Sequence, residues 1–262
     1  MNSVLITGGS SGIGLEISKR FAQKKYQICW VSLFEEEVEL ARKELLNEFQ
    51  NTDIRHFIQD LSKEHGAQNI LDWVIDNNLN IDVVINNAGF ATYGMSSEIP
   101  MAKEVNMIQL NVMSVYKMTR LFLDYLKAKK KGTIINISSN TSFQPVPKMT
   151  AYAATKAFVS YYGQGLQAEL KEQNSKIRIL TVCPAAIKDT NFKVAAKMEK
   201  VKTFDALIAT TKKEVADDVW KAFINGSTYI ITGAKLRNLN WLTKILPKFI
   251  LMKLMKDELS EC

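Results

Sequence analysis

The chain has 262 residues, of which 47% are hydrophobic and 23% are charged, a balance that is ordinary for a globular protein. This length is compatible with one α/β domain and is ample for a buried core. The formal net charge of +7 comes without a run of five basic residues or a recognition motif, so we expect no nucleic-acid partner.

The cysteines and histidines of the chain predict a protein without a metal site. The three cysteines include no Cys-x-x-Cys pair, and the only two histidines are His56 and His65. Cys29 and Cys183 each lie in an apolar run, which is typical of buried strand thiols in a reducing compartment. Strand-like sequence begins at Val4 without an apolar signal region before it, so we expect a cytoplasmic location.

Short apolar runs rich in β-branched residues alternate with longer amphipathic stretches along the chain. The predicted strands lie at residues 4–7, 27–32, 54–59, 83–86, 133–138, 177–183 and 229–232. The predicted helices lie between them, at residues 13–25, 35–49, 63–78, 101–130, 151–172 and 213–223. This alternation predicts one doubly wound α/β domain, with a seven-stranded parallel sheet and helices on both faces. We expect that domain at residues 1–233, with a variable segment near 192–211 and a C-terminal tail at 234–262.

A glycine-rich turn joins the first predicted strand to the first predicted helix. Residues 7–14 read TGGSSGIG. Glycines permit a tight turn and close backbone approach, and the N-terminus of the helix offers free N–H groups to a pyrophosphate. A plain strand-to-helix turn would look similar. Asp60, the run NNAG at residues 86–89 and a later tyrosine-lysine pair also follow strands, however, and ligands of open α/β sheets bind at those ends.

Tyr152 and Lys156 lie four residues apart on a predicted helix, so both side chains can point into one cleft. A nearby ammonium favours a phenolate, so we expect Lys156 to lower the pKa of Tyr152 below about 10. Ser139 precedes Tyr152 by thirteen residues, and Asn111 lies in the long predicted helix upstream. Each residue alone has a plainer interpretation: a surface helix residue, a polar strand end or, for Asn111, a disturbance of the helix.

Together these motifs resemble the short-chain dehydrogenase/reductase family over roughly residues 2–233. The resemblance implies a Rossmann fold, a nicotinamide dinucleotide across the strand ends, and interconversion of a ketone and a secondary alcohol. It implies that Tyr152 is the acid and base, and that Lys156 lowers its pKa and holds the nicotinamide ribose. It also implies that Ser139 polarises the substrate oxygen and that Asn111 secures a water in a proton relay. The alternative is a dinucleotide-sensing or scaffold protein without chemistry, a class that typically loses the tyrosine-lysine pair.

The same resemblance implies a set of dinucleotide contacts along the strand ends. Asp60 and Leu61 would lie near adenine, although Asp60 has a helix N-cap as its plainer role. The threonine after the sixth strand comes one position later than in the family, which favours the backbone of Ile187 as the carboxamide contact. The complete set is Gly8, Ser10, Ser11, Gly12, Ile13, Gly14, Ser32, Leu33, Asp60, Leu61, Asn87, Ala88, Gly89, Tyr152, Lys156, Pro184, Ile187 and Thr190.

Ser32 and Leu33 occupy the positions expected to distinguish NAD from NADP. NAD enzymes of the family commonly have Asp at the first position, and NADP enzymes commonly have a basic residue at the second. Neither is present here. Ser32 avoids the repulsion of a carboxylate and could donate to a phosphate, so the sequence favours NADP(H) over NAD(H). Glu35, Glu36 and Glu37 open a predicted helix, and we interpret them as first-turn carboxylates facing its dipole.

The expected substrate wall is mostly apolar, which favours a hydrophobic carbonyl or alcohol substrate. It comprises Phe90, Ala91, Thr92, Tyr93, Phe143, Gln144, Val146, Met149 and residues 192–198. The two long helices resemble those through which the family forms homodimers and homotetramers.

The tail at residues 240–256 mixes apolar residues with lysines and is too short and too charged to span a bilayer. Three interpretations stay open: a helix over the substrate cleft or against a second subunit, a helix in peripheral contact with a membrane, or a disordered end. Similar basic, apolar tails occur in bacterial members of the family.

Overall fold

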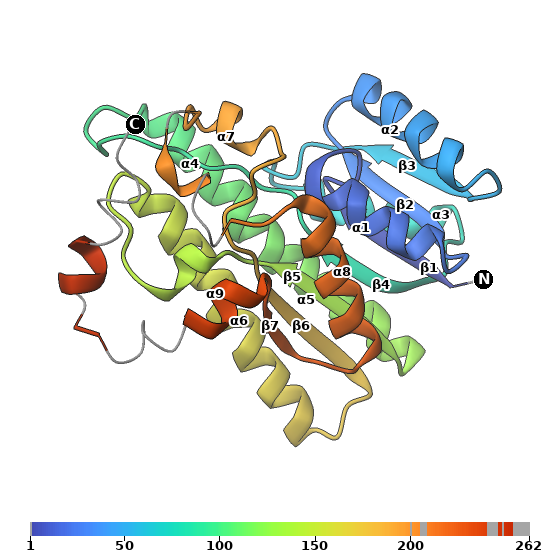
Figure 1. The fold of residues 1–262 in the computed structure, drawn as a ribbon. Helices are drawn as coiled ribbons and strands as arrows, with labels where there is room; N and C mark the ends of the chain where they lie inside the picture. Colours follow the sequence, from blue (N-terminus) through green and yellow to red (C-terminus); the bar gives the residue numbers. More distant parts are fainter. Residues whose placement is uncertain (1, 200, 205–208, 240–245, 248, 254–262) are drawn as a thin grey trace.

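The computed structural model describes residues 2–199, 201–204, 209–239, 246–247 and 249–253 (Figure 1). Most of the tail at residues 240–256 lies outside these residues, so its three interpretations stay predictions. One seven-stranded sheet forms the centre of the fold, in the order β3-β2-β1-β4-β5-β6-β7. Every strand pairing is parallel, which confirms the predicted doubly wound α/β fold.

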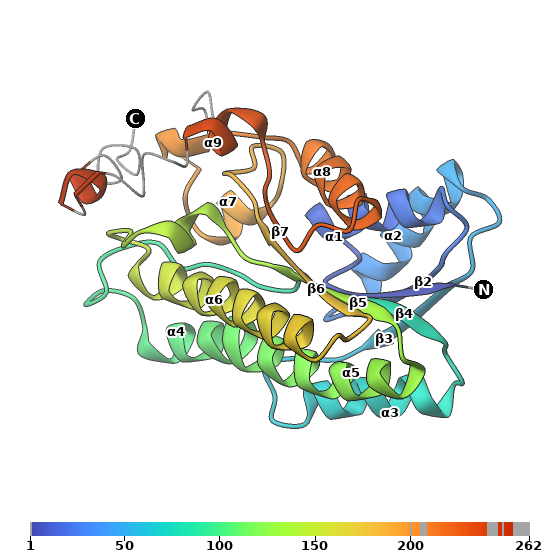
Figure 2. The same cartoon turned by 90° about the horizontal axis from the view of Figure 1, so that it is seen from below.

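Helices cover both faces of this sheet, as Figure 2 shows. The strands are β1 (Ser3–Thr7), β2 (Gln27–Ser32), β3 (Ile54–Ile58), β4 (Ile81–Asn86), β5 (Gly132–Ile137), β6 (Ile177–Cys183) and β7 (Tyr229–Ile231). One face packs against α1 (Gly12–Ala22), α2 (Glu35–Glu48) and α8 (Lys212–Ile224). The other face packs against α3 (Gly66–Asp76), α5 (Val115–Lys129) and α6 (Thr150–Glu172).

The strand side chains are buried on both faces because successive residues of a strand point to opposite sides. In β1, Val4 and Ile6 pack into the core beneath α1 and α2, whereas Leu5 packs beneath α3 and α5. All three residues are fully buried. This two-sided burial explains why the strands read as continuous apolar runs in the sequence.

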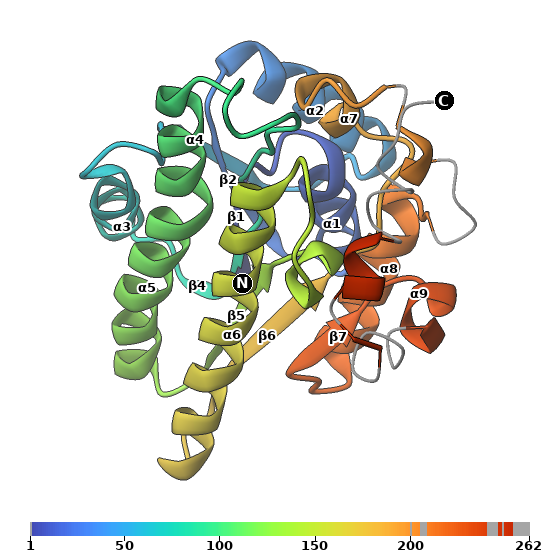
Figure 3. The ribbon, with the colours of Figure 1, turned by 90° about the vertical axis from the view of Figure 1, so that its left-hand side faces the viewer.

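The predicted helix at residues 101–130 is helical without a break from Met101 to Lys129, but it is not α-helical throughout. It consists of α4 (Met101–Ile108), a π-helical segment η1 (Gln109–Ser114) and α5, which runs beside α6 (Figure 3). The helix predicted at residues 63–78 begins only at Gly66, because a turn occupies the residues after Asp60.

The variable segment near 192–211 contains α7 (Phe192–Ala195) and a 3-10 turn η3 (Lys202–Phe204), and α9 (Ala234–Leu239) follows β7. The part of the chain that the structure describes contains no helix long and apolar enough to cross a membrane.

Candidate active site

The glycine-rich turn between β1 and α1 requires its glycines for steric reasons. Gly8 and Gly12 have φ angles of 62° and 54°, a left-handed conformation that side chains rarely adopt. At Gly14, a Cβ would lie 2.1 Å from the carbonyl oxygen of Gly8, so only glycine allows the helix to approach the turn this closely. The first turn of α1 therefore presents its free N–H groups at the carboxyl end of β1.

The loop after β4 is fastened to this turn by hydrogen bonds. The hydroxyl of Thr7 accepts from the backbone N–H groups of Asn87 and Ala88, each at 3.0 Å. The Asn87 side chain donates to the carbonyl oxygens of Thr7 and Gly8, also at 3.0 Å. These bonds place Asn87, Ala88 and Gly89 beside the glycine-rich turn, as the sequence predicts.

The residues predicted to lie near the adenosine occupy different environments. The Ser32 hydroxyl donates to the Ser10 hydroxyl at 2.9 Å, and both side chains are buried, whereas Leu33 is half exposed. The Leu61 side chain packs into the core beneath α3, so only its backbone could contact an adenine. Asp60 accepts from the N–H and the hydroxyl of Ser62 at 2.9 and 2.7 Å, so it caps a turn and not the helix predicted after it.

The charge of Asp60 is favoured by these hydrogen bonds. Burial would raise the pKa of the Asp60 carboxyl, but the bonds from Ser62 and the charge of Lys63 outweigh burial and lower that pKa. The side chain is therefore ionised at neutral pH. A fixed anion at the end of β3 suits recognition of N–H groups rather than of a phosphate.

One carboxylate in the acidic first turn of α2, that of Glu35, is bound to a side chain of β3. Glu35, Glu36 and Glu37 form that first turn, as the helix-dipole interpretation predicts. Glu35 Oε1 lies 2.9 Å from His56 Nε2 on β3, and His56 Nδ1 lies 2.8 Å from Arg42 Nη2. Glu35 is thus bound to His56 of β3, which in turn contacts Arg42 of α2.

Asn111 lies in the π-helical segment and is fully buried. Its Oδ1 accepts from the N–H of Phe90 at 3.2 Å, and its Nδ2 donates to the Phe90 carbonyl at 2.9 Å and to Thr155 Oγ1 at 3.2 Å. A Cβ on Gly89 would lie 2.8 Å from Asn111 Oδ1 and 3.6 Å from Lys156 Nζ. Asn111 therefore joins the loop after β4 to α6, close to the predicted catalytic lysine. A single widened turn at a functional residue is a common use of π-helix.

Tyr152, Lys156 and Ser139 meet at the carboxyl ends of β5 and β6. Tyr152 and Lys156 are each 6% exposed, and Lys156 Nζ lies 5.8 Å from the centre of the Tyr152 ring. Lys156 Nζ also donates to the carbonyl of Ile137 at 2.9 Å. Ser139 caps the 3-10 turn η2 (Asn140–Phe143), where its Oγ accepts from the N–H of Thr141 at 3.2 Å. The structure therefore brings together the residues that the sequence predicts as catalytic.

Burial shifts the pKa values of the tyrosine and the lysine in opposite directions. It raises the pKa of Tyr152 to about 12, against an opposing hydrogen bond with Ser139. It lowers the pKa of Lys156 to about 8. The direction for Tyr152 differs from the sequence expectation that Lys156 lowers this pKa. The physical reason is that removing a phenolate from water costs more free energy than the hydrogen bond with Ser139 returns.

A cavity of about 260 Å³ connects the glycine-rich turn to these side chains. Its polar side includes Ser139, Tyr152, Lys156 and Thr190, and its apolar side is formed from the η2 loop and the segment after β6. The apolar and mixed lining comprises Gln144, Val146, Met149, Ala186, Ile187, Phe192, Met198, Thr203 and Phe204.

Some of the predicted wall does not line this cavity. Phe90, Ala91 and Tyr93 belong to the apolar cluster beside it, whereas Phe143 packs with Cys183 near β7. Thr203 and Phe204 line the cavity but were absent from the prediction, as were Asn140 and Thr141 of η2. A signal for the η2 pair was present, since both directly follow Ser139 in the sequence.

One feature of the cavity, a buried threonine hydroxyl in its wall, fits a bound dinucleotide. Thr190 Oγ1 is buried in its wall and has no hydrogen-bond partner among the described residues. A Cβ on Gly12 would lie 4.0 Å from the Thr190 methyl carbon Cγ2, so the Thr190 side chain lies next to the glycine-rich turn. An unpaired buried hydroxyl normally finds a partner, and a ligand lying across the turn could provide one.

Comparison with known proteins identifies the family. The family model described as short chain dehydrogenase matches residues 2–200. The very-long-chain 3-oxoacyl-CoA reductase of Rattus norvegicus is 30% identical over 257 residues, which cover 95% of this chain and 77% of that protein. The chain therefore belongs to the short-chain dehydrogenase/reductase family, whose members are oxidoreductases that use nicotinamide dinucleotides.

Other relatives match over part of their length. The very-long-chain 3-oxoacyl-CoA reductase of Anas platyrhynchos is 31% identical over 75% of this chain, but the match covers only 61% of that protein. The Danio rerio protein named reductase-B is 29% identical, and 65% of it is covered. The chain thus spans less than two thirds of these two relatives.

Solved structures agree with the fold over nearly the whole chain. A short-chain dehydrogenase from Sphingobium yanoikuyae in complex with NADPH has a TM-score of 0.81 and 25% identity, covering 98% of this chain and 96% of its own. The bulky-bulky ketone specific alcohol dehydrogenase from Comamonas testosteroni has a TM-score of 0.74 and 26% identity, covering 88% and 86%.

Proposed function

We propose that the protein is an NADP(H)-dependent oxidoreductase that reduces the ketone of a hydrophobic substrate to a secondary alcohol. The observation that carries the proposal is the pair Tyr152 and Lys156, buried side by side in a cavity that continues to the glycine-rich turn. The apolar lining favours a hydrophobic substrate. A 3-oxoacyl thioester is the first candidate, because relatives carry the name very-long-chain 3-oxoacyl-CoA reductase.

In this proposal, Tyr152 donates the proton that the reduced carbonyl oxygen takes up. With a pKa raised to about 12, its hydroxyl stays protonated at neutral pH and can act as the acid. Ser139 donates a hydrogen bond to the same oxygen and polarises it. The bound dinucleotide would supply the hydride.

Lys156 stabilises the phenolate that remains after the proton has left. Its pKa of about 8 keeps most of the ammonium charged at neutral pH. Asn111 holds the loop at Phe90 and the helix at Thr155, and we assign it the relay position through which Lys156 regains contact with solvent protons. The glycine-rich turn would hold the pyrophosphate, and Ile187 and Thr190 would hold the carboxamide.

The preference for NADP(H) rests on the adenosine end of the site. Ser10 and Ser32 place two hydroxyls there without a carboxylate of their own, and Glu35 is bound to His56. A carboxylate at this position would repel a 2′-phosphate. Solved structural neighbours hold NADPH, NAD or NADP, so the proposal rests on these side chains alone. Steady-state kinetics with NADPH and NADH side by side test it, and a clear preference for NADH would reject it.

We also propose that the protein assembles as a homodimer or homotetramer through the outer faces of η1, α5 and α6. Tyr116, Phe158 and Tyr161 are 41%, 40% and 73% exposed on those faces. Tyr162 contacts two of them, with ring centres 5.5 Å from Tyr116 and 5.6 Å from Phe158. A contiguous exposed aromatic surface of this kind is typical of a subunit interface. A cytoplasmic location and a membrane contact through the tail stay predictions.

The central experiment assays the purified protein by nicotinamide absorbance against ketones that include a 3-oxoacyl thioester. Tyr152→Phe should lower kcat by about 10²- to 10⁴-fold, because the proton donor is lost. Its Kd for NADPH should change by less than about twofold, since one hydroxyl near the nicotinamide is removed. Tyr161→Phe is the matched control on the same helix, because Tyr161 is exposed and away from the cavity.

The outcome also decides between an enzyme and a dinucleotide-binding protein without chemistry. Turnover of one ketone that is lost in Tyr152→Phe but kept in Tyr161→Phe supports the enzyme. Tight NADPH binding without turnover of any ketone in the panel, unchanged by Tyr152→Phe, would support a sensor or scaffold. Retained turnover in Tyr152→Phe would show that the proton donor is misassigned.

A further inference from the structure

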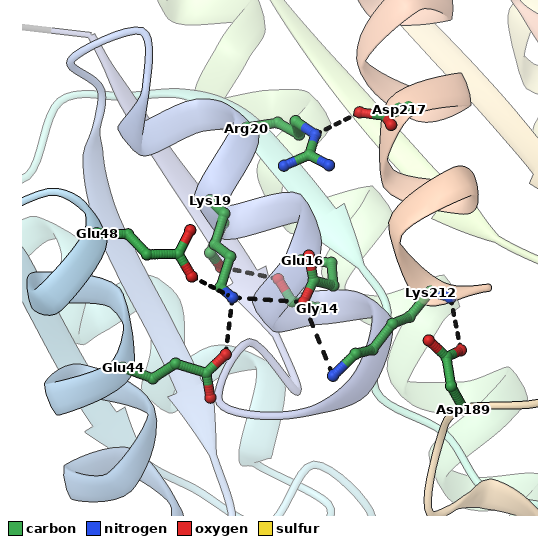
Figure 4. A network of polar contacts seen from close by, with 10 residues as sticks. Gly14, Glu16, Lys19, Arg20, Glu44, Glu48, Asp189, Lys212 and Asp217 are labelled. Carbon is green, nitrogen blue, oxygen red and sulfur yellow. Dashed lines mark hydrogen bonds and ion pairs between the residues drawn. The ribbon is translucent and has the colours of Figure 1, made fainter.

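A chain of charged groups connects the helix after the glycine-rich turn to two neighbouring elements (Figure 4). Glu16 on α1 has a side chain only 9% exposed, and its Oε1 lies 3.5 Å from Lys19 Nζ and 3.7 Å from Lys212 Nζ. Lys19 Nζ also lies 2.7 Å from Glu44 and 2.7 Å from Glu48, both on α2. Burial would lower the pKa of Lys19, but these carboxylates outweigh it and raise that pKa. Glu16 is therefore held between two lysine side chains.

Lys212 lies where the segment after β6 returns to the body of the protein. It is the first residue of α8, and its backbone N–H donates to Asp189 Oδ1 at 2.8 Å. Two residues earlier, Thr210 forms an isolated parallel bridge with Ile187. The Thr210 N–H donates to the carbonyl of Ala186 at 2.8 Å. The two ends of the segment 189–209 are thus fastened to each other, and the side chain of Lys212 connects them to α1.

The chain of contacts closes on the cavity itself. Asp189 is followed by Thr190, whose Oγ1 is buried in the cavity wall without a partner in the described part of the chain. The methyl group of Thr190 stands beside Gly12. Contacts therefore run from α1 through Glu16, Lys212 and Asp189 to Thr190, and back to the turn at which α1 begins. Lys212 thus contacts both α1, through Glu16, and Asp189, the residue that precedes Thr190.

We propose that Lys212 is a positioning residue of the dinucleotide site. Its side chain binds Glu16 and its backbone binds Asp189, and together these contacts hold the Thr190 hydroxyl at the glycine-rich turn. The Lys212 side chain is 33% exposed, so its ion pair contributes little to the free energy of unfolding. The ion pair instead affects where the Thr190 hydroxyl lies. This position matters because hydrogen bonds to a ligand weaken steeply when donor and acceptor are misaligned.

The test measures NADPH binding and does not depend on the substrate. Lys212→Met removes the charge and keeps most of the length of the side chain. We expect its Kd for NADPH, measured by calorimetry, to rise by about three- to tenfold, the cost of about one hydrogen bond. Lys212→Arg should restore binding. Lys213→Met is the matched control, because Lys213 is the adjacent lysine, is exposed and makes no ion pair with any described residue.

A double variant shows whether Lys212 acts through Thr190. Thr190→Val alone should weaken NADPH binding, and Lys212→Met added to it should weaken binding no further. The dependence of kcat on pH should stay that of the unmodified protein, because Tyr152 and Lys156 are untouched. Equal Kd values for Lys212→Met and Lys213→Met, or additive losses in the double variant, would overturn the proposal.

A second pair of variants tests the hydrogen bond between the Lys212 N–H and Asp189. It also keeps the proposal testable if a Lys212 variant does not fold. Asp189→Ala removes the acceptor of the Lys212 N–H, whereas Asp189→Asn keeps an oxygen in that place. We expect a raised Kd for NADPH in Asp189→Ala and a nearly unchanged Kd in Asp189→Asn. The same Kd in both variants, at melting temperatures close to that of the unmodified protein, would refute a role of the hydrogen bond between Lys212 and Asp189.

Discussion

Replacing Lys156 by methionine should make the protein more stable at neutral pH while it abolishes turnover. Lys156 is 6% exposed, and burial lowers its pKa to about 8 from the ordinary value of about 10.4. One pKa unit corresponds to about 1.4 kcal/mol, so keeping this ammonium charged in the folded state costs ~3 kcal/mol below that pKa. Methionine has a similar length and carries no charge.

The gain is smaller than this cost because one hydrogen bond is lost. Lys156 Nζ donates to the carbonyl of Ile137 at 2.9 Å, and an unpaired buried carbonyl costs about 1–3 kcal/mol. At about pH 7 we therefore expect Lys156→Met to be more stable than the unmodified protein by up to ~2 kcal/mol. Between about pH 8 and about pH 10.4 the folded protein loses the Lys156 proton while the unfolded chain keeps it. Stability of the unmodified protein thus rises with pH relative to the variant, by ~3 kcal/mol in all.

Urea denaturation of both proteins at about pH 7 and about pH 10 measures this change. All other titrating groups are common to the two proteins, so they cancel in the difference between their free energies of unfolding. The order of stability should reverse, with the unmodified protein the more stable one at the higher pH. A difference that does not change with pH would refute the reasoning, because it would mean that Lys156 is not desolvated in the folded state.

Three further predictions concern turnover, packing and assembly. The kcat/KM for ketone reduction should fall above about pH 8 as Lys156 loses its charge, and a flat profile through about pH 9 would contradict this. Gly163→Ala should destabilise the fold in urea by about 1–3 kcal/mol, since its Cβ would lie 2.3 Å from the Thr181 hydroxyl. Gly165→Ala, with nothing within 4 Å of its Cβ, should instead stabilise it by about 0.5–1 kcal/mol, and equal effects would argue against this packing. Tyr161→Glu should lower the mass measured by light scattering, and an unchanged mass would exclude this face as the interface.

The strands could be predicted because burial on both sides leaves a strong local signal. Val4, Leu5 and Ile6 are all fully buried although they point to opposite faces, so the run is apolar throughout. The glycine-rich turn was equally visible, because a left-handed φ at Gly8 and Gly12 restricts the residue type directly. Both signals depend on the local backbone. Contacts between distant parts of the chain altered only the residues at which these strands and the helix after the turn begin and end.

The features that the sequence did not reveal depend on contacts distant in the chain. The π-helical turn at Asn111 is held by bonds to Phe90 and Thr155, and the apolar period of residues 101–130 does not mark it. Phe204 reaches the cavity wall because the ends of its segment are joined at Ile187 and Thr210. The pKa of Tyr152 likewise depends on how deeply the folded chain buries it.

The burial that raises the pKa of Tyr152 is compatible with its proposed role as an acid. Before transfer the phenol is neutral, and it gains little from an ammonium 5.8 Å from the centre of its ring. After transfer the phenolate and the Lys156 ammonium attract each other, and two unit charges separated by this distance to the ring centre attract by roughly 3 kcal/mol at an effective dielectric constant of about 20. Because this attraction grows only as the proton leaves, it stabilises the transition state more than the ground state, which is the condition for catalysis. A tyrosine whose pKa was already low would be a phenolate paired with its lysine before the reaction. The attraction would then be present in the ground state as well, and it would no longer favour the transition state.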